Sequence, residues 1–292
     1  MSEKPGIAWT FHGTVIVRNY AEAVGKLSRL CGCTPLEFGN AGPPVARLGG
    51  CCAFGDNVLE IVEPNDETSP PARYLARFGP GMYNLALQVE DLRQTSAWLS
   101  RNGAPPTLPA HLGFTFTRPS ETLGLQFEWA DLRSAWDPRF GGAIPQSRPP
   151  RIHAPRVAFW GALVVDPISA VKRLTQLWRL DLLFARDDAA PDEAAVGISL
   201  NDGVLLLYAL PTDVDEEARL WGSRLGRARF HAIGMRVGDL AETRRALGEE
   251  RISILREAPR AVVSDPADTL GVAFVWTDAD TPGDPRGPLT AT

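Results

Sequence analysis

The chain has 292 residues, the length expected of two domains of about 100–200 residues each, and its 44% hydrophobic and 22% charged residues are ordinary for a globular protein. The formal net charge of -5 argues against nucleic acid as the main partner, because phosphate binding needs a concentrated basic surface. No apolar run reaches the roughly 18–20 residues that cross a bilayer, and the first residues lack the apolar segment of a secretory signal, so we expect a cytoplasmic protein.

The first part of the chain is predicted to alternate strands and helices. Residues 11–17 form a short apolar run bounded by polar residues, as in a strand, and 21–30 have helical spacing. The same order returns with a strand at 83–89 and a helix at 92–103, which ends on a glycine suited to a helix C-cap. Further strand-like runs follow the two helices, at 45–54, 57–63, 113–118 and 124–130. This half is therefore expected to contain the order βαβββ twice.

The second half repeats the first at an offset of about 147–148 residues. The matching segments are FHGTVIVRN (11–19) with FWGALVVDP (159–167), YNLALQVEDL (83–92) with HAIGMRVGDL (231–240), TLGLQFEWAD (122–131) with TLGVAFVWTD (269–278), and more faintly NVLEIVEP (57–64) with GVLLLYALP (203–211). Helices are expected near 168–178 and 240–248. The predicted fold class is α+β, with tandem paired βαβββ modules whose curved sheets form a cup in each half.

The repeat and the composition predict the domain boundaries. We expect an N-terminal domain at 1–132 and a C-terminal domain at 157–278. The segment 133–156 is rich in Pro, Gly and Arg and lacks periodicity, which is typical of a linker. The last residues, 279–292, have the composition of a flexible tail.

Four polar residues occupy equivalent places on the predicted strands of the N-terminal half. His12 and Asn84 lie at the same position of the first strand in each module, and Glu60 and Glu128 each interrupt an apolar run, VLEIV and LQFEW. Because alternate residues of a strand share a face, we expect these four side chains to converge inside one cup.

This arrangement resembles the vicinal-oxygen-chelate superfamily, which includes glyoxalase I, methylmalonyl-CoA epimerase, fosfomycin-resistance proteins and extradiol dioxygenases, in its tandem two-domain form. The stretch EIVEPNDETSPPARYLARFGPGMYNLALQVEDL (60–92) is most similar to the epimerase branch, and the resemblance covers nearly all of 9–131 and, more weakly, 157–278. It implies the glyoxalase/bleomycin-resistance/dihydroxybiphenyl dioxygenase fold. It also implies metal ligands at His12, Glu60 and Glu128. The fourth ligand, usually His, falls on Asn84, which departs from the family pattern.

The implied ligand set is rich in oxygen. It favours Mn²⁺ or Mg²⁺ as the divalent metal ion, with Fe²⁺, Co²⁺, Ni²⁺ and Zn²⁺ as alternatives. The separate proton-transferring Glu of the epimerases has no counterpart, because the corresponding strand reads VARLGG (45–50). Proton transfer would then fall to a ligand carboxylate, so Glu60 and Glu128 are the expected catalytic residues. The alternative to a metal as the positive charge beside Glu60 and Glu128 is Arg47. In that case the site would be a pocket for organic ligands without a metal.

The second half lacks such a set of residues. Its matching positions are occupied by Trp160, Leu206, Ala232 and Val275, none of which can bind a metal, so a degenerate cup is expected. His231 lies one residue from a ligand position and is expected on the opposite strand face in a structural role. His111, in a proline-rich loop, is a weaker candidate for the border of the N-terminal cup.

These features favour a metal-dependent isomerase, epimerase or lyase acting on a small oxygenated substrate chelated through adjacent oxygens. The alternative is a non-enzymatic small-molecule binding or resistance protein of the same fold. A ring-cleaving extradiol dioxygenase ranks lowest, because the site lacks two His and one carboxylate and the usual two-half dioxygenase has its ligands in the C-terminal half. The expected partner is a small-molecule substrate, with no nucleic acid and no membrane, in a monomer or homodimer.

Overall fold

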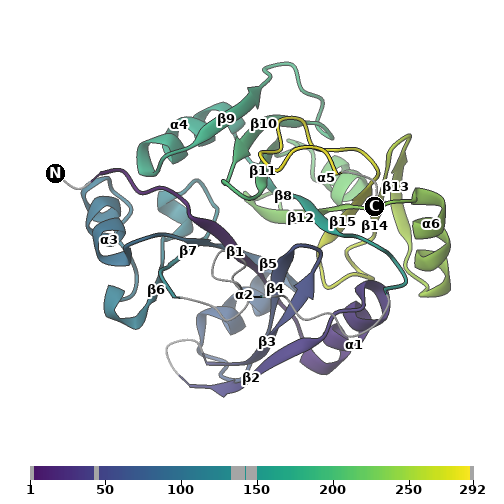
Figure 1. Cartoon of the computed structure of the whole chain (residues 1–292), viewed down its shortest axis with the longest axis horizontal. Coiled ribbons are helices and arrows are strands. Elements are labelled where there is room, and N and C mark those ends of the chain that lie inside the picture. The colour runs from purple at the N-terminus through teal and green to yellow at the C-terminus, as the bar shows by residue number, and fades with distance from the viewer. Residues whose placement is uncertain (1–2, 43–45, 133–141, 143–149, 290–292) are drawn as a thin grey trace.

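The computed structural model describes residues 3–42, 46–132, 142 and 150–289, which form two mixed sheets with helices packed around them (Figure 1). The elements of the first half are β1 (Trp9–Ile16), α1 (Tyr20–Cys31), β2 (Pro35–Ala41), β3 (Arg47–Phe54), β4 (Asn57–Pro64), α2 (Pro70–Phe78), β5 (Gly81–Gln88), α3 (Leu92–Arg101), β6 (Phe114–Phe116) and β7 (Phe127–Ala130). Those of the second half are β8 (Arg156–Val164), α4 (Pro167–Leu177), β9 (Asp181–Ala185), β10 (Ala194–Ser199), β11 (Val204–Ala209), α5 (Val214–Trp221), β12 (Arg229–Arg236), α6 (Leu240–Glu249), β13 (Ile254–Ala258), β14 (Ala261–Ser264) and β15 (Ala273–Thr277).

The two sheets share one topology. Within the described residues, the strand order is β2-β3-β4-β1-β5-β7-β6 in the first sheet and β13-β14-β15-β12-β8-β11-β10-β9 in the second. β1 pairs antiparallel with β5 and parallel with β4, and β8 pairs in the same way with β12 and β11. The predicted α+β fold of repeated modules is thus confirmed. One described module is shorter than expected, because only β6 and β7 follow α3, whereas three strands follow each of α1, α4 and α6.

A capping residue begins the helix that follows the first strand of every module. Asn19, Asp91, Asp166 and Asp239 precede α1, α3, α4 and α6, and each side chain accepts a hydrogen bond from a backbone N–H of the first turn. Such caps satisfy donors that a helix otherwise leaves unpaired and are worth about 1 kcal/mol each. The repeated cap therefore fixes where each helix starts relative to its strand.

The two sheets are packed back to back on one apolar core. Alternate residues of the central strands are buried in a single cluster, among them Val15 of β1, Leu85 of β5, Trp160 of β8 and Ile233 of β12. The contact is closest at Gly13, where a Cβ atom would lie 2.4 Å from Cζ3 of the Trp160 ring. Only a glycine leaves room for the indole at this point, so the two halves are fitted to each other.

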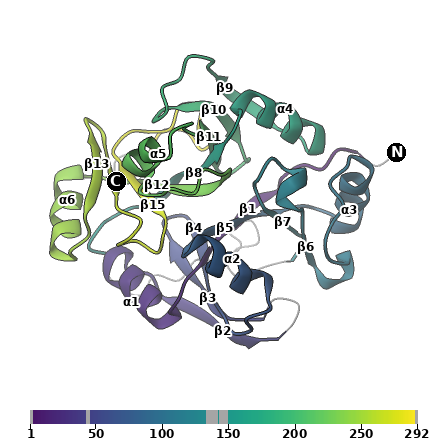
Figure 2. The same ribbon diagram turned by 180° about the vertical axis from the view of Figure 1, so that it is seen from behind.

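Helices also meet across the two halves. α1 lies beside α6, and α3 lies beside α4, in both views of the molecule (Figures 1 and 2). Arg29 of α1 pairs with Glu250 at 3.0 Å, and Trp98 Nε1 of α3 donates to the carbonyl of Leu177 in α4 at 2.8 Å. The expected linker at 133–156 falls mostly on 133–141 and 143–149, outside the described residues. We propose that 1–132 and 157–278 are units of duplication, which share a core.

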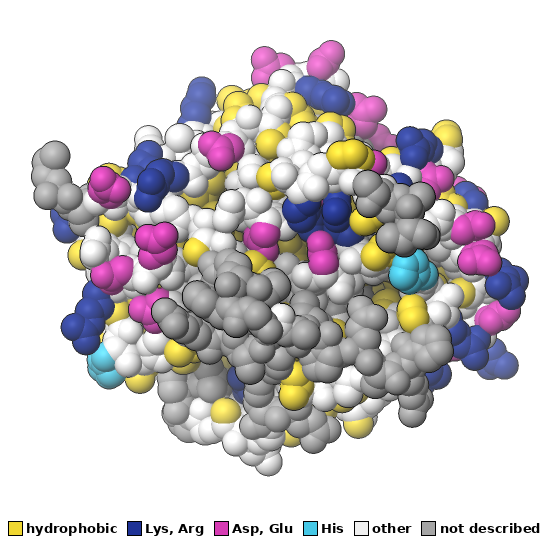
Figure 3. Space-filling view, in the orientation of Figure 1, with side chains coloured by type: hydrophobic (Ala, Val, Ile, Leu, Met, Phe, Trp, Pro, Cys, Tyr) yellow, Lys and Arg dark blue, Asp and Glu magenta, His cyan; other side chains and the backbone are white. Residues whose placement is uncertain are grey.

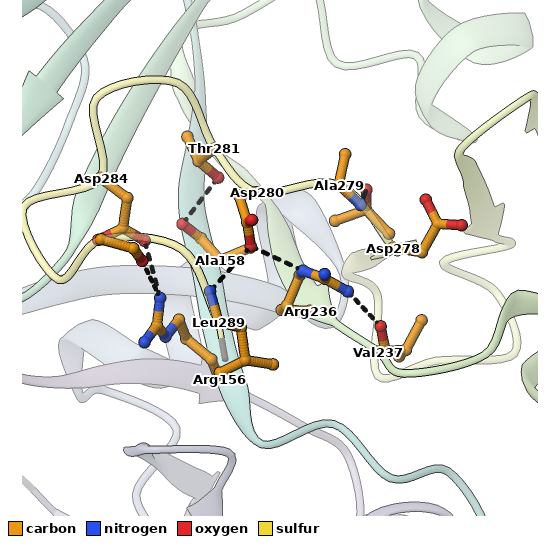
Figure 4. A network of polar contacts seen from close by, with 12 residues as sticks. Arg156, Ala158, Arg236, Val237, Asp278, Ala279, Asp280, Thr281, Asp284 and Leu289 are labelled. Atoms are coloured by element: carbon orange, nitrogen blue, oxygen red, sulfur yellow. Dashed lines mark hydrogen bonds and ion pairs between the residues drawn. The ribbon is translucent and has the colours of Figure 1, made fainter. Parts of the chain in front are cut away.

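The C-terminal segment differs from the flexible tail that its composition predicts. Residues 279–289 lie against the second sheet, where Asp280 pairs with Arg236 at 2.9 Å and Thr281 Oγ1 donates to the carbonyl of Ala158 at 3.2 Å (Figure 4). Arg286 reaches the first half and pairs with Asp56 at 2.9 Å. Polar side chains of the segment therefore find partners that composition alone does not reveal.

The face of the molecule shown in Figure 3 has no large patch of one charge, because Lys and Arg lie among Asp and Glu. Among the described residues, no helix combines the length and the apolar character that a membrane span requires.

Candidate functional site

The four polar residues singled out in the sequence lie on the four central strands of the first sheet. His12 is on β1, Glu60 on β4, Asn84 on β5 and Glu128 on β7, and each is at most 8% exposed. In the register of these strands, Thr14 faces both Glu60 and Asn84, and Ala86 faces both His12 and Glu128. The structure thus brings all four side chains into one cavity of 620 Å³, the N-terminal cup.

His12 is the centre of the arrangement. Its Nε2 atom lies 3.4 Å from Glu60 Oε2 and 3.6 Å from Glu128 Oε2, and Asn84 Nδ2 lies 3.5 Å from the same Glu128 oxygen. In the described part of the chain, neither ring nitrogen of His12 has a hydrogen-bond partner, and neither does Asn84 Oδ1, although all three atoms are buried. Buried polar atoms without partners are unusual in proteins, and an ion or a ligand is a common explanation.

Arg47 and Thr14 hold Glu60 in place. Arg47 Nη2 lies 2.9 Å from Glu60 Oε1, and Thr14 Oγ1 donates to Glu60 Oε2 at 2.9 Å. Burial alone would raise the pKa of Glu60, but His12, Arg47 and Thr14 together lower it to about 2. Burial likewise opposes the charged form of His12, yet Glu128 and Glu60 raise its pKa to about 9. Without a metal, the cup is therefore an imidazolium and a guanidinium balanced by two carboxylates.

Two distances between donor atoms of the cup can be compared with those of a metal site. Neighbouring ligand atoms bound about 2.1 Å from one ion lie roughly 3.0–3.5 Å apart, close to the 3.4 and 3.6 Å from His12 Nε2 to the two carboxylates. Within 3–42, 46–132, 142 and 150–289, no group of three or more His, Cys, Asp or Glu side chains is arranged so that it could hold a metal ion. The residues nevertheless fit a divalent ion chemically, because they supply a nitrogen, two carboxylates and the unpartnered amide oxygen of Asn84.

Two β-bulges bring residues into the cup that strand alternation assigns to the other face. The register of β1 against β5 skips Phe11 between Thr10 and His12, and it skips Tyr83 opposite the step from Thr14 to Val15. A bulge places its extra residue beside its neighbour, so Phe11 and Tyr83 line the cavity next to His12 and Asn84. The sequence gives no local signal for either bulge.

The same two bulges occur in the second half, and the register of β8 there corrects one predicted equivalence. The register of β8 against β12 pairs Phe159 with Gly234, so Phe159 and not Trp160 is the counterpart of His12. Trp160 instead faces the shared core. His231 is the bulged residue of β12 and lies on the cup side, not on the opposite face as expected.

The C-terminal cup is filled with apolar side chains. Phe159, Leu206, Ala232 and Val275 are buried in one hydrophobic cluster. His231 packs edge-on against Trp221, with ring centroids 4.4 Å apart, and burial together with Arg229 holds its pKa well below the ordinary value. A neutral, packed imidazole agrees with a structural role. His111 is exposed on a short 3₁₀ turn and does not line the N-terminal cup.

Comparisons with known proteins agree with this architecture. The family model described as Glyoxalase/Bleomycin resistance protein/Dioxygenase superfamily matches residues 11–116. A triple mutant of 4-hydroxymandelate synthase from Streptomyces coelicolor is 15% identical, covers 97% of this chain and 96% of its own, and superposes with a TM-score of 0.61. The 2,3-dioxygenase LapB from Pseudomonas sp. KL28 is 15% identical over 98% of this chain and 97% of its own, with a TM-score of 0.60.

A shorter likeness involves one half of the molecule. Methylmalonyl-CoA epimerase from Mycobacterium tuberculosis is 19% identical and covers 46% of this chain and 94% of its own, with a TM-score of 0.41. No curated protein matches the chain in sequence. The two full-length likenesses show the fold alone. Residues 11–116 therefore form a domain of the glyoxalase/bleomycin resistance/dioxygenase superfamily, and the two halves of the chain repeat one architecture.

Proposed function

We propose that the N-terminal cup binds one divalent cation through His12, Glu60 and Glu128, with Asn84 completing the set or leaving a position for substrate. The observation that carries this proposal is the approach of both carboxylates to Nε2 of His12, at 3.4 and 3.6 Å. Oxygen-rich ligands favour Mn²⁺ or Mg²⁺.

The proposed reaction is an isomerisation, epimerisation or lyase step on a small substrate that presents two adjacent oxygens. When bound, the cation supplies Lewis-acid stabilisation of negative charge on a substrate oxygen. The two carboxylates then have different tasks. Both oxygens of Glu60 are held, by Arg47 and by Thr14, so Glu60 is a fixed ligand. Glu128 contacts His12 and Asn84 through Oε2, which leaves its Oε1 to accept or return a proton at the substrate carbon.

Metal analysis of protein purified without chelator tests the proposal. We expect about one divalent ion per chain, and we expect His12→Ala to lose both the ion and the activity while remaining folded. The matched control is His111→Ala, an exposed histidine outside the cup, which should keep the ion. Metal-free wild-type protein, or His12→Ala protein that retains a full ion, would contradict the proposal.

The second candidate function is small-molecule binding without catalysis. The ion pair between Arg47 and Glu60 favours it, because protonated His12 and Arg47 already balance the two carboxylates. In that case, chelator-treated wild type and His12→Ala should bind the same ligands equally well. Extradiol ring cleavage ranks third, since the described lining of the cup contains one histidine, and oxygen uptake with catechols tests it.

A further inference from the structure

A second cavity lies where the two halves meet. This inter-half cleft has a volume of 470 Å³ and is lined by α1, α2 and the start of β5 from the first half, and by the end of α5, the start of β12 and residues 266–271 from the second. Among the described residues, none lines both this cleft and the N-terminal cup. Pro80 and Gly271 bring the two halves into backbone contact in its wall, since a Cβ atom at Gly271 would overlap the carbonyl oxygen of Pro80. The cleft is therefore a separate cavity whose two sides are fixed to each other.

The first half contributes two aromatic rings to the cleft, and both are held in place. Tyr74 and Phe78 lie one turn apart on α2, with ring centroids 5.1 Å apart. The Tyr74 hydroxyl donates to the carbonyl of Met82 at 2.9 Å, and its ring packs edge-on against Tyr83, which lines the N-terminal cup. The guanidinium of Arg227, from the second half, lies 5.7 Å from the centre of the Phe78 ring. Rings that are ordered before a ligand arrives lose little entropy when it binds.

The second half contributes a third ring. Trp221, at the end of α5, is buried and lines the cleft. The guanidinium of Arg256 lies 5.2 Å from the centre of a Trp221 ring, and the imidazole of His231 packs edge-on against the indole with centroids 4.4 Å apart. Apolar side chains continue the lining on this side, namely Leu225, Pro266 and Leu270. Aromatic and apolar surfaces of both halves thus border one cavity.

The charged side chains of the cleft are largely balanced. Its described lining contains the acid Glu22 and the cations Arg18, Lys26 and Arg229. Arg229 is paired with the buried Glu217 at 2.6 Å, and Lys26 Nζ donates to a backbone carbonyl of the second half at 2.6 Å. Arg18 is exposed, and an exposed ion pair contributes little free energy. A ligand would therefore be held mainly through its apolar body, with a weak preference for a negative charge near Arg18.

We infer that the inter-half cleft is a second ligand-binding site, which takes a planar aromatic compound with one carboxylate. The rings of the ligand lie against Tyr74, Phe78 and Trp221, where flat surfaces favour stacked or edge-on contacts. The carboxylate lies at the exposed end, beside Arg18. Sites of this volume at the junction of two structural units commonly bind small molecules. No metal takes part, so this inference is independent of the proposed function of the N-terminal cup.

Three simple compounds test the ligand class by calorimetric titration of the full-length protein. 2-Naphthoate and cyclohexanecarboxylate carry the same charge and differ in the aromatic body, whereas 2-naphthamide keeps the rings and lacks the charge. We expect 2-naphthoate to bind at least about tenfold more tightly than cyclohexanecarboxylate, and no more than about fivefold more tightly than 2-naphthamide. Chelator treatment should leave these affinities unchanged. Equal binding of the two carboxylates, or no measurable binding of 2-naphthoate, would overturn the inference.

Three half-buried phenylalanines locate the bound compound. Phe78 lines the cleft, Phe116 lines the N-terminal cup, and Phe184 in β9 lines neither. Phe78→Ala should weaken 2-naphthoate binding at least about fivefold, while Phe116→Ala and Phe184→Ala should leave it unchanged. Ala267→Trp, at an exposed position in the lining, should abolish binding by filling the cleft, and its folding is checked by urea unfolding. Weaker binding in Phe116→Ala alone, or unchanged binding in both cleft variants, would place the compound elsewhere and refute the site.

Discussion

The packing of Gly13 against Trp160 predicts opposite effects for the same substitution at two glycines. In Gly13→Ala, the new Cβ would lie 2.4 Å from Cζ3 and 2.9 Å from Cη2 of the indole, closer than any relaxed contact. Trp160 is 1% exposed and has no open space to enter. Overpacking of this kind costs about 1–3 kcal/mol, and reduced freedom of the unfolded chain returns about 0.4–1 kcal/mol. The expected net loss in the free energy of unfolding is about 1–2 kcal/mol.

Urea unfolding measures this loss, and two further variants control it. Gly25→Ala, in the middle of α1, meets only Arg29 Nη1 at an ordinary 3.6 Å and should stabilise the protein by about 0.5–1 kcal/mol. Trp160→Phe removes both clashing ring atoms, so Gly13→Ala in that background should be neutral or stabilising. The back-to-back packing would be refuted if Gly13→Ala were as stabilising as Gly25→Ala, or if its cost persisted beside Trp160→Phe.

Three other outcomes follow from the electrostatics. The neighbouring carboxylates raise the pKa of His12 to about 9 despite its burial, so metal binding at pH 8 should release about 0.9 proton, compared with about 0.03 from a histidine of ordinary pKa. Calorimetry in buffers of different ionisation enthalpy measures the number of protons released. Near-zero release would show that the metal does not displace a proton from His12. Arg286→Gln should lower the free energy of unfolding by about 1–2 kcal/mol, while Arg219→Gln at a surface pair should change it by less than about 0.5 kcal/mol; equal effects would mean that the C-terminal segment is not anchored. Glu217→Gln should cost about 3–5 kcal/mol, because Glu217 is buried and the substitution leaves the half-buried Arg229, 2.6 Å away, without its counter-charge; a loss below 1 kcal/mol would contradict the pairing.

The sequence was sufficient to predict the arrangement of modules and the convergence of four polar side chains. Both depend on repetition: a duplicated pattern places His12 and Asn84, and likewise Glu60 and Glu128, at equivalent points of equivalent strands. Strand alternation then assigns each to a face. The role of these residues as metal ligands stays a prediction.

Other features depend on single-residue shifts or distant contacts that a sequence pattern does not encode. One extra residue at a bulge moves Tyr83 into the N-terminal cup. In the other half, the register of β8 differs by one residue from the sequence match, so Phe159 takes the place expected of Trp160. The anchoring of 279–289 requires Arg286 to meet Asp56, a partner that is remote in sequence. Composition indicates how segments of this kind usually behave. It does not reveal the distant residue that holds this particular segment in place.

The shared core has a consequence for how mutations act at a distance. Since one core cluster contains buried residues of both halves, we expect the chain to melt as one cooperative unit, with the slowest amide hydrogen exchange in β5 and β12 alike. A substitution that creates a cavity behind the C-terminal cup would then lower the folded population of the N-terminal cup by the same factor as that of the C-terminal cup. Loss of function from a variant more than a strand away from His12 should accordingly be recovered by cooling or by a saturating ligand, both of which restore the folded population without touching the altered residue.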